Sequence, residues 1–204
     1  MGVSLKGTGG SCLRAGQEDL QSTGSEEYMT MSSQKEAIPP TSTKGVLELL
    51  PLFPVVLVTT QTNIITIGQI HYFTFSPLRI GIAIAHSRHT HSLLKAEQEF
   101  VVNVPNADLV AAVKLCGSVS GRDQDKFEAA GLTSAESVEV RAVSIGECGA
   151  HIECVVEREI EFEKRTWFVG RVVAACKCPD HQGTDALLCG RTQYAIPGKV
   201  IGPR

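Results

Sequence analysis

The sequence lacks any run of 18 or more apolar residues, the length that a helix needs to cross a bilayer. The longest candidate, Leu78 to Ala85, is far too short. The first residues lack the apolar centre of a secretory signal, and Lys6 stands where a myristoylation motif requires Ser or Thr. These absences predict a cytoplasmic protein with no membrane partner.

Other absences narrow the possible functions. The formal net charge is only −3, with 20% charged residues, so no broad basic surface for nucleic acid is expected. The sequence contains no GxGxxG, GxxxxGK[ST] or GxSxG motif, which removes the usual dinucleotide, nucleotide and esterase interpretations. Its seven cysteines are odd in number, and several lie in apolar strand patterns, which suits free thiols in a reducing compartment.

The composition divides the chain into a tail and one domain. Residues 1–44 are mostly Gly, Ser, Thr, Gln and Glu, with hardly any large apolar side chain. Such a segment cannot offset its ordering entropy by burial, so we expect it to be disordered. Residues 45–204 are long enough for a single domain with a core.

Extended apolar segments dominate that domain. The predicted strands are Val55–Thr59, Asn63–Phe73, Leu78–Ala85, Phe100–Val104, Val138–Val143, His151–Glu163, Thr166–Lys177, and a terminal strand containing Leu187-Leu188 and Tyr194-Ala195. Helices are predicted from Thr90, capped by Thr90 or Ser87, and at Asp108–Gly117 and Lys126–Gly131. Many strands joined by short turns favour a mainly β fold, an antiparallel barrel with few helices.

Gly68 lies in the middle of the long strand predicted for Asn63–Phe73. A glycine inside a strand commonly marks a bulge or a place where another group approaches the backbone. A flat ligand is one such group.

A short polar cluster, Ser87 to Thr90, follows the third strand and opens a helix. Hydroxyls, the Arg88 guanidinium and free N–H groups at a helix start are the donors that a phosphate needs. The alternative is that Ser87 and Thr90 only cap the helix. Because Arg88 stands beside two hydroxyls, the pattern favours an anion site.

Two further clusters contain metal-ligating residue types. Cys176, Cys178 and His181 match no standard zinc spacing and are better explained as incidental residues at a strand end. The histidines at 86, 89 and 91 are better explained by the anion-binding turn. No metal site is predicted.

The sequence resembles the flavin reductase-like, FMN-binding split-barrel proteins, the group that includes flavoredoxin. The segments that carry the resemblance, in order, are PVVLVTT, NIITIG, SRHTHSLL, EFVVNVP, CGSVSGRDQDKFEAAGLT and FVGRVVAA. They span about Pro54 to Tyr194. The block from Cys116 to Thr133 is the most specific of them.

The resemblance implies a six-stranded antiparallel split barrel that holds FMN non-covalently near a homodimer interface. It implies that the ring lies beside Asn63, Thr66, Ile67 and Gly68, and the phosphate beside Ser87, Arg88 and Thr90. Lys126 and its neighbour Phe127 are also placed near the cofactor, although Lys126 could instead be a solvated helix lysine. Many relatives carry Ser-Trp where this chain has Gly68-Gln69, so an aromatic residue near the ring is absent.

The implied activity is that of an NAD(P)H-dependent flavin or ferric reductase. Hydride would pass from nicotinamide to flavin N5, and electrons would continue to free flavin, Fe(III) or a protein acceptor. Because the cofactor carries this chemistry, no catalytic side chain is predicted. Two alternatives stay open: a flavoredoxin-like electron carrier without NAD(P)H activity, and a non-enzymatic protein that binds or stores FMN.

Overall fold

A computed structural model gives the structure of the chain and describes residues 38–190 and 193–198. The chain divides into two units that meet at Gly45 and Val46, and the sheets and pockets lie in the second. Residues 1–37, most of the tail predicted to be disordered, lie outside the described residues. Among the described residues, no helix is long and apolar enough to cross a membrane.

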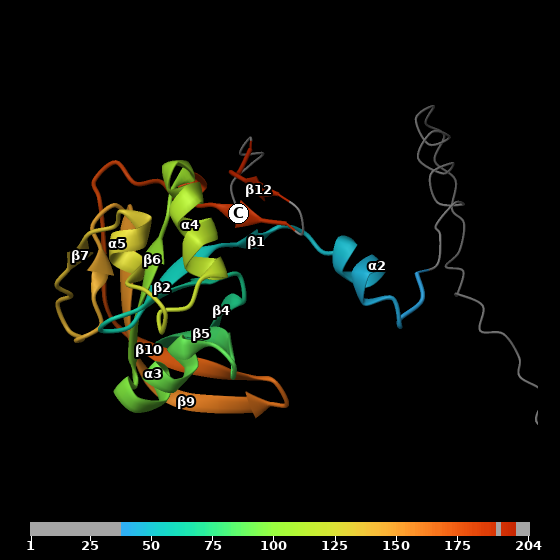
Figure 1. The fold of residues 1–204 in the computed structure, drawn as a ribbon, viewed down its shortest axis with the longest axis horizontal. Helices are drawn as coiled ribbons and strands as arrows, with labels where there is room; N and C mark the ends of the chain where they lie inside the picture. The colour runs from blue at the N-terminus through green and yellow to red at the C-terminus, as the bar shows by residue number, and fades with distance from the viewer. Residues whose placement is uncertain (1–37, 191–192, 199–204) are drawn as a thin grey trace, which may run out of the picture. The chain divides into compact units, whose positions relative to one another are not determined.

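A seven-stranded antiparallel sheet forms the body of the domain (Figure 1). Its strands, in spatial order, are β3 (Ile64–Ile67), β2 (Val56–Thr59), β6 (Glu99–Val104), β9 (Ala150–Phe162), β10 (Arg165–Lys177), β5 (Leu78–Ala85) and β4 (Ile70–Phe75). The prediction of a mainly β, antiparallel fold with few helices is therefore confirmed.

The remaining elements are helices, 3₁₀ turns and short strands. The helices are α2 (Thr43–Glu48), α3 (His89–Glu97), α4 (Val110–Ser118) and α5 (Lys126–Ala130), with 3₁₀ turns η2 (Ala107–Leu109) and η3 (Gly183–Asp185). Short strands β1 (Phe53–Pro54), β11 (Leu188–Cys189) and β12 (Tyr194–Ala195) form one small sheet, and β7 (Ser134–Ala135) pairs with β8 (Ser144–Ile145). In Figure 1, α4 and α5 lie beside β2 and β6, whereas α3 lies beside β9 and β10.

The sheet has seven strands and not six because the long strand predicted for Asn63–Phe73 is broken at Gly68-Gln69. Its two halves, β3 and β4, form opposite edges of the sheet. Because only Gly68 and Gln69 separate these two edge strands, the sheet must curl until its edges approach; the Gln69 carbonyl extends the β4–β5 ladder by accepting from the Ala83 N–H at 3.0 Å. The break therefore lets the chain pass from one edge of a half-closed barrel to the other.

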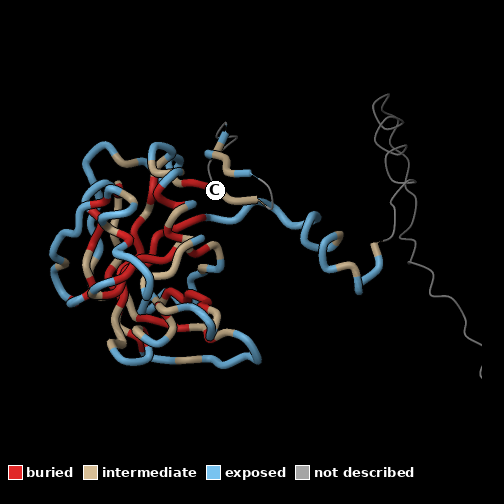
Figure 2. The backbone as a smooth tube through the Cα atoms, in the orientation of Figure 1, coloured by how far each residue is buried: buried red, intermediate tan, exposed pale blue. Residues whose placement is uncertain are grey.

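Strands β2 and β3 are buried on both faces, which explains their nearly continuous apolar sequence. Val56, Val58 and their β3 neighbours pack inside the curled sheet with Phe100 and Phe168. On the opposite face, Leu57 packs with side chains of α4 in a second core. Figure 2 shows the buried positions gathered in the middle of the domain, with the β9–β10 hairpin reaching outward to an exposed tip.

The strand predicted for Val138–Val143 is wrong. Glu153, only 2% exposed, accepts hydrogen bonds from the backbone N–H groups of Val138, Glu139 and Val140 at 2.9, 2.7 and 3.2 Å. A carboxylate on a distant strand thus takes the donors that a neighbouring strand would use. The β-branched pattern of the segment gives no sign of this competitor.

Two other local predictions have different outcomes. Helix α5 follows the sequence closely, with Asp125 as N-cap and Gly131 in the left-handed conformation that ends it. The predicted cap of α3 is wrong, because Arg88 is its N-cap residue and makes no side-chain cap bond. Thr90 lies inside the first turn and is buried.

Candidate functional site

The polar turn after β5 leads directly into the first turn of α3. The Arg88 N–H donates to the Ala85 carbonyl at 3.0 Å, which reverses the chain at the end of the strand. Because no side chain caps α3, the orphan N–H groups of its first turn remain available to an anion. In the part of the chain that the structure describes, no carboxylate forms an ion pair with Arg88.

Asn63 reaches this turn from the residue that precedes β3. Its Nδ2 donates to the Thr90 hydroxyl at 2.8 Å, while its Oδ1 is buried and has no donor among the described residues. A buried acceptor without a partner costs about 1–3 kcal/mol, and a ligand hydroxyl placed there would remove that cost. Gly121 leaves the space open, since a Cβ atom at that position would lie 2.1 Å from Oδ1.

Lys126 is 4% exposed, so its interpretation as a solvated helix lysine is wrong. Its ammonium group donates to the carbonyls of Ile64 and Cys116 at 2.8 and 2.9 Å, which ties β3 to the end of α4. Burial lowers the pKa of Lys126, and the nearby Arg88 lowers it further. An anion beside both groups would oppose that shift and favour the charged amine.

These residues line one small cavity of about 60 Å³. Its walls are Asn63, Ile65, Ser87, Arg88, His89, Thr90, Cys116, Val119, Ser120, Gly121 and Lys126. The lining includes two cationic side chains and, among the described residues, no carboxylate. We call this space the anion cavity.

A second space of about 200 Å³, the edge groove, adjoins the anion cavity, and Ile65 and Arg88 line both. Its other walls are Thr66, Ile67, Gly68, Gln69, Ala83, Ile84, Ala85 and Arg165. The groove therefore follows the exposed edge of β3 and the end of β5. No carboxylate is among the described residues that line it.

The edge of β3 offers backbone groups to this groove. The Thr60 N–H donates to the Asn63 carbonyl at 3.0 Å, so the backbone groups of Asn63 point toward β2. Along an antiparallel strand, successive residues direct their N–H and C=O groups to opposite sides. The N–H and C=O of Ile64 and Thr66 therefore point away from β2. The bond from Lys126 to the Ile64 carbonyl agrees with this direction. Thr66 thus presents a donor and an acceptor to the groove, which suits the edge of a planar heterocycle.

Gly68 lies at the strand break and not in the middle of a strand. A Cβ atom added there would meet only the Pro54 carbonyl oxygen, at 3.9 Å. Within the described chain, therefore, no protein group requires a glycine at this position. A close approach by a ligand in the groove stays a prediction.

The predicted site residues separate into three groups. Asn63, Ser87, Arg88, Thr90 and Lys126 meet in the anion cavity, and Thr66, Ile67 and Gly68 meet in the edge groove. Phe127 is not brought to either space, because it packs against the second core. The side chains of Thr66 and Ile67 also point elsewhere: the Thr66 hydroxyl donates to the Val113 carbonyl at 2.6 Å, and Ile67 packs in the barrel core.

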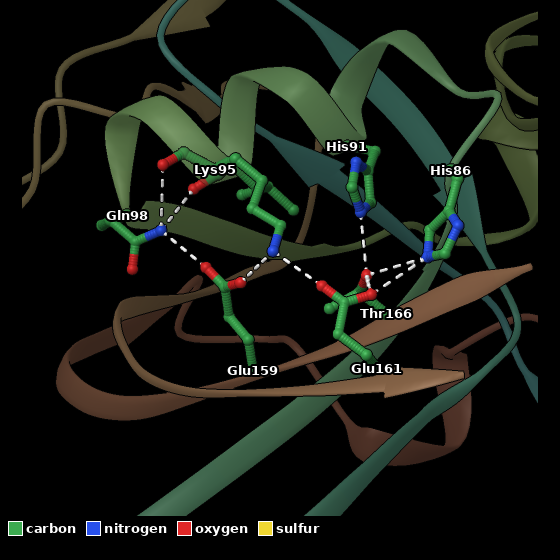
Figure 3. A network of polar contacts seen from close by, with 8 residues as sticks. His86, His91, Lys95, Gln98, Glu159, Glu161 and Thr166 are labelled. Carbon is green, nitrogen blue, oxygen red and sulfur yellow. Dashed lines mark hydrogen bonds and ion pairs between the residues drawn. The ribbon is translucent and has the colours of Figure 1, made fainter. Parts of the chain in front are cut away.

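A polar network joins the turn of residues 86–91 to the β9–β10 hairpin (Figure 3). The buried Thr166 hydroxyl donates to Glu161 at 2.9 Å. It lies 2.8 Å from Nε2 of His91 and 3.2 Å from Nε2 of His86. With its proton directed at Glu161, the Thr166 oxygen accepts from Nε2 of His91, whereas Nε2 of His86 lies equally close to Thr166 and to the Glu161 carboxylate, at 3.2 Å from each.

Lys95 completes this network with bonds to Glu159 and to Glu161, the latter at 2.7 Å. The Lys95 bond holds the pKa of Glu161 down to about 2, whereas burial lowers the pKa of His91. His86 directly precedes Ser87, and Thr166 directly follows Arg165. The network therefore fixes the two segments that carry the arginines of the groove.

Comparison with known proteins assigns the fold to a family. Residues 52–197 match the model of the flavin reductase like domain. The chain belongs to the flavin reductase-like family. An uncharacterized protein of Archaeoglobus fulgidus is 42% identical over 113 residues, which cover 55% of this chain and 64% of that protein.

Solved structures of the family share the half-closed barrel. Flavoredoxin from Methanosarcina acetivorans superposes with a TM-score of 0.74 at 23% identity, covering 84% of this chain and 95% of that one. An NADH:FAD oxidoreductase of Streptomyces globisporus gives a TM-score of 0.71 at 20% identity, covering 81% and 99%. These likenesses confirm the split-barrel fold of a flavin reductase-like protein.

Sequence reasoning gave no role to several residues that line these two spaces, and three of them bear on the site: Ser120, Gly121 and Arg165. Ser120 and Gly121 lie within the segment most specific to the family but received no role, and only the fold places them against Asn63. Arg165 lies between the strands predicted for His151–Glu163 and Thr166–Lys177 and received no role, but it lines the edge groove. Nothing in the local sequence indicates that the β9–β10 hairpin reaches the end of β3.

Proposed function

We propose that this chain binds FMN, with the phosphate in the anion cavity and the isoalloxazine ring in the edge groove. The observation that carries the proposal is that the two spaces adjoin: a cavity with cations and free helix N–H groups shares Ile65 and Arg88 with a groove along an unpaired strand edge. The first suits a dianionic phosphate and the second suits a flat ring with donors and acceptors.

In this proposal the chain's own residues bind and orient the cofactor. The phosphate is held by Arg88, Ser87 and the first turn of α3, and the buried ammonium group of Lys126 adds a second positive charge. The unpaired Asn63 Oδ1 accepts from a hydroxyl of the ribityl chain. The Thr66 backbone meets the pyrimidine edge of the ring. Bound FMN would supply the redox chemistry by accepting a hydride at N5 and passing electrons onward.

The proposed activity is that of an NAD(P)H-dependent flavin or ferric reductase. Support comes from family membership and from the likeness to an NADH:FAD oxidoreductase. The likeness to a flavoredoxin favours a second candidate, an electron carrier reduced by a protein partner. The two candidates require the same cofactor site and differ in whether nicotinamide reduces it.

We also propose that two copies of the chain associate near the groove. Large apolar side chains are exposed on the β4–β5 hairpin and at the tip of β9; they are Tyr72, Phe73, Phe75, Leu78, Ile160 and Phe162. Contiguous exposure of this kind is typical of an interaction surface. Phe73 contacts Trp167 of β10, at 5.5 Å between ring centroids, so the two exposed regions adjoin. Conversion of a dimer to a monomer by Phe75→Glu, measured by light scattering, would support this surface.

The decisive experiment is a spectrum followed by a reduction. The purified protein is mixed separately with FMN, FAD and riboflavin, and each sample is then desalted. Flavin absorbance should remain with the protein in the FMN sample. Anaerobic NADH or NADPH should then bleach the bound flavin if the chain is a reductase. Retained flavin that neither nucleotide bleaches would support the carrier, and failure to retain any flavin would contradict both candidates.

A further inference from the structure

Arg165 and Gln69 join two distant parts of the chain across the edge groove. Arg165 begins β10 opposite Ala85 of β5, and its Nη1 donates to the Gln69 side-chain oxygen at the strand break. Both side chains line the edge groove, and neither lines the anion cavity. The guanidinium is therefore held beside the space assigned to the ring and apart from the space assigned to the phosphate.

Arg165 forms no ion pair among the described residues, although Glu163 lines a neighbouring pocket with it. No carboxylate among the described residues lines the groove. Gln69 holds the guanidinium with a neutral amide oxygen, which fixes its position and leaves its charge intact. A glutamate there would make the same bond and cancel the charge.

The phosphate does not account for this cation, because Arg88 and Lys126 already face the anion cavity. A second negative charge develops on a flavin during its reduction. Two electrons and one proton, delivered together as hydride, leave the reduced ring with one negative charge spread over N1 and the C2 carbonyl. A fixed cation beside the ring stabilises that charge more than it stabilises the neutral oxidised ring.

We propose that Arg165, positioned by Gln69, stabilises the anionic reduced form of the flavin and so raises its midpoint potential. This inference rests on the proposed binding of FMN. It also gives a role to Gln69, the residue that stands where many relatives carry an aromatic side chain. The midpoint potential of the ring is set here by the charge of Arg165, which lines the groove.

The test compares midpoint potentials of FMN bound to the full chain, measured by spectroelectrochemical titration. Arg165→Gln should lower the preference for reduced over oxidised FMN by about tenfold, which for two electrons is a downward shift of about 30 mV. Gln69→Glu keeps the position of Arg165 but adds an opposing charge, so it should shift the potential in the same direction. Arg165→Lys should retain most of the original potential.

Lys164→Gln is the matched control, because Lys164 is the adjacent cation on the same hairpin turn but does not line the groove. Its potential should equal that of the unaltered protein. An unchanged potential in Arg165→Gln, or an equal shift in Lys164→Gln, would overturn the inference. If Arg165→Gln does not fold, Gln69→Glu decides the question alone. Failure of the unaltered chain to bind flavin would refute the proposed function itself, and this inference with it.

Discussion

Replacement of Arg88 by alanine should weaken FMN binding and leave the fold intact. The Arg88 side chain is exposed, and no carboxylate in the described part of the chain pairs with it, so its removal strands no buried group. Its backbone N–H, which turns the chain after β5, is kept by alanine. If the phosphate lies in the anion cavity as proposed, the substitution removes its contact with Arg88 and also the repulsion that lowers the pKa of Lys126.

The expected magnitude is that of one hydrogen bond between charged groups, about 1.5–3 kcal/mol. This corresponds to a rise of roughly 10- to 150-fold in Kd. Because the guanidinium is solvent-accessible, salt should screen the contact, and the effect should shrink as ionic strength increases.

The assay is a titration of flavin fluorescence at low and at moderate salt, with FMN and riboflavin in parallel. Riboflavin has no phosphate, so Arg88→Ala should change its affinity much less than that of FMN, although Arg88 also lines the edge groove. Arg122→Ala is the control, since Arg122 lies in the neighbouring loop but does not line the anion cavity. Equal FMN affinity in Arg88→Ala and the unaltered protein would refute the assignment of the phosphate to this turn.

Four further substitutions test other parts of the structure. Gly68→Val should expel flavin without unfolding the domain, because no protein atom obstructs the new side chain; full FMN occupancy after desalting would contradict this. Lys126→Met leaves two backbone carbonyls without their donor, so the free energy of unfolding, measured by denaturant titration, should fall by about 1–3 kcal/mol. FMN should also bind more weakly in a fluorescence titration, and an unchanged value of either quantity would refute the corresponding role of Lys126. Glu153→Gln should lower the free energy of unfolding by about 1.5–3 kcal/mol, because its carboxylate accepts three backbone N–H groups. FMN affinity should not change, since Glu153 lines neither the anion cavity nor the edge groove; a lowered affinity would contradict this. Glu161 has a pKa held near 2, so its stabilising contribution is present above its unfolded pKa of about 4.5 and is lost as the pH falls toward 2. In Glu161→Gln, the melting temperature should therefore depend less on pH in this range, and the same pH dependence as in the unaltered protein would contradict the network.

Local patterns determined the secondary structure wherever the competing partners are also local. Extended runs of apolar and β-branched residues located β5 and the long hairpin strands, and the Asp125 cap with Gly131 bounded α5. Each of these signals depends on neighbours within a few residues, so one sequence contains it completely. The ordered family segments likewise predicted the barrel from the sequence alone.

The predictions failed where a distant group decides the local structure. The carboxylate of Glu153 takes the donors of Val138–Val140 from a remote strand, and only the curl of the sheet explains why the chain breaks after Gly68. No pattern within either segment specifies a partner that is far away in the sequence.

The candidate site shows the same division. The sequence alone singled out Ser87, Arg88 and Thr90 as an anion-binding turn, because hydroxyls and a cation at a helix start are a local signal. Only the tertiary structure buried Lys126 beside that turn and brought Arg165 across the groove to Gln69. The function of a charged side chain depends on its burial and on the groups near it, and the pairing of strands distant in the sequence determines both.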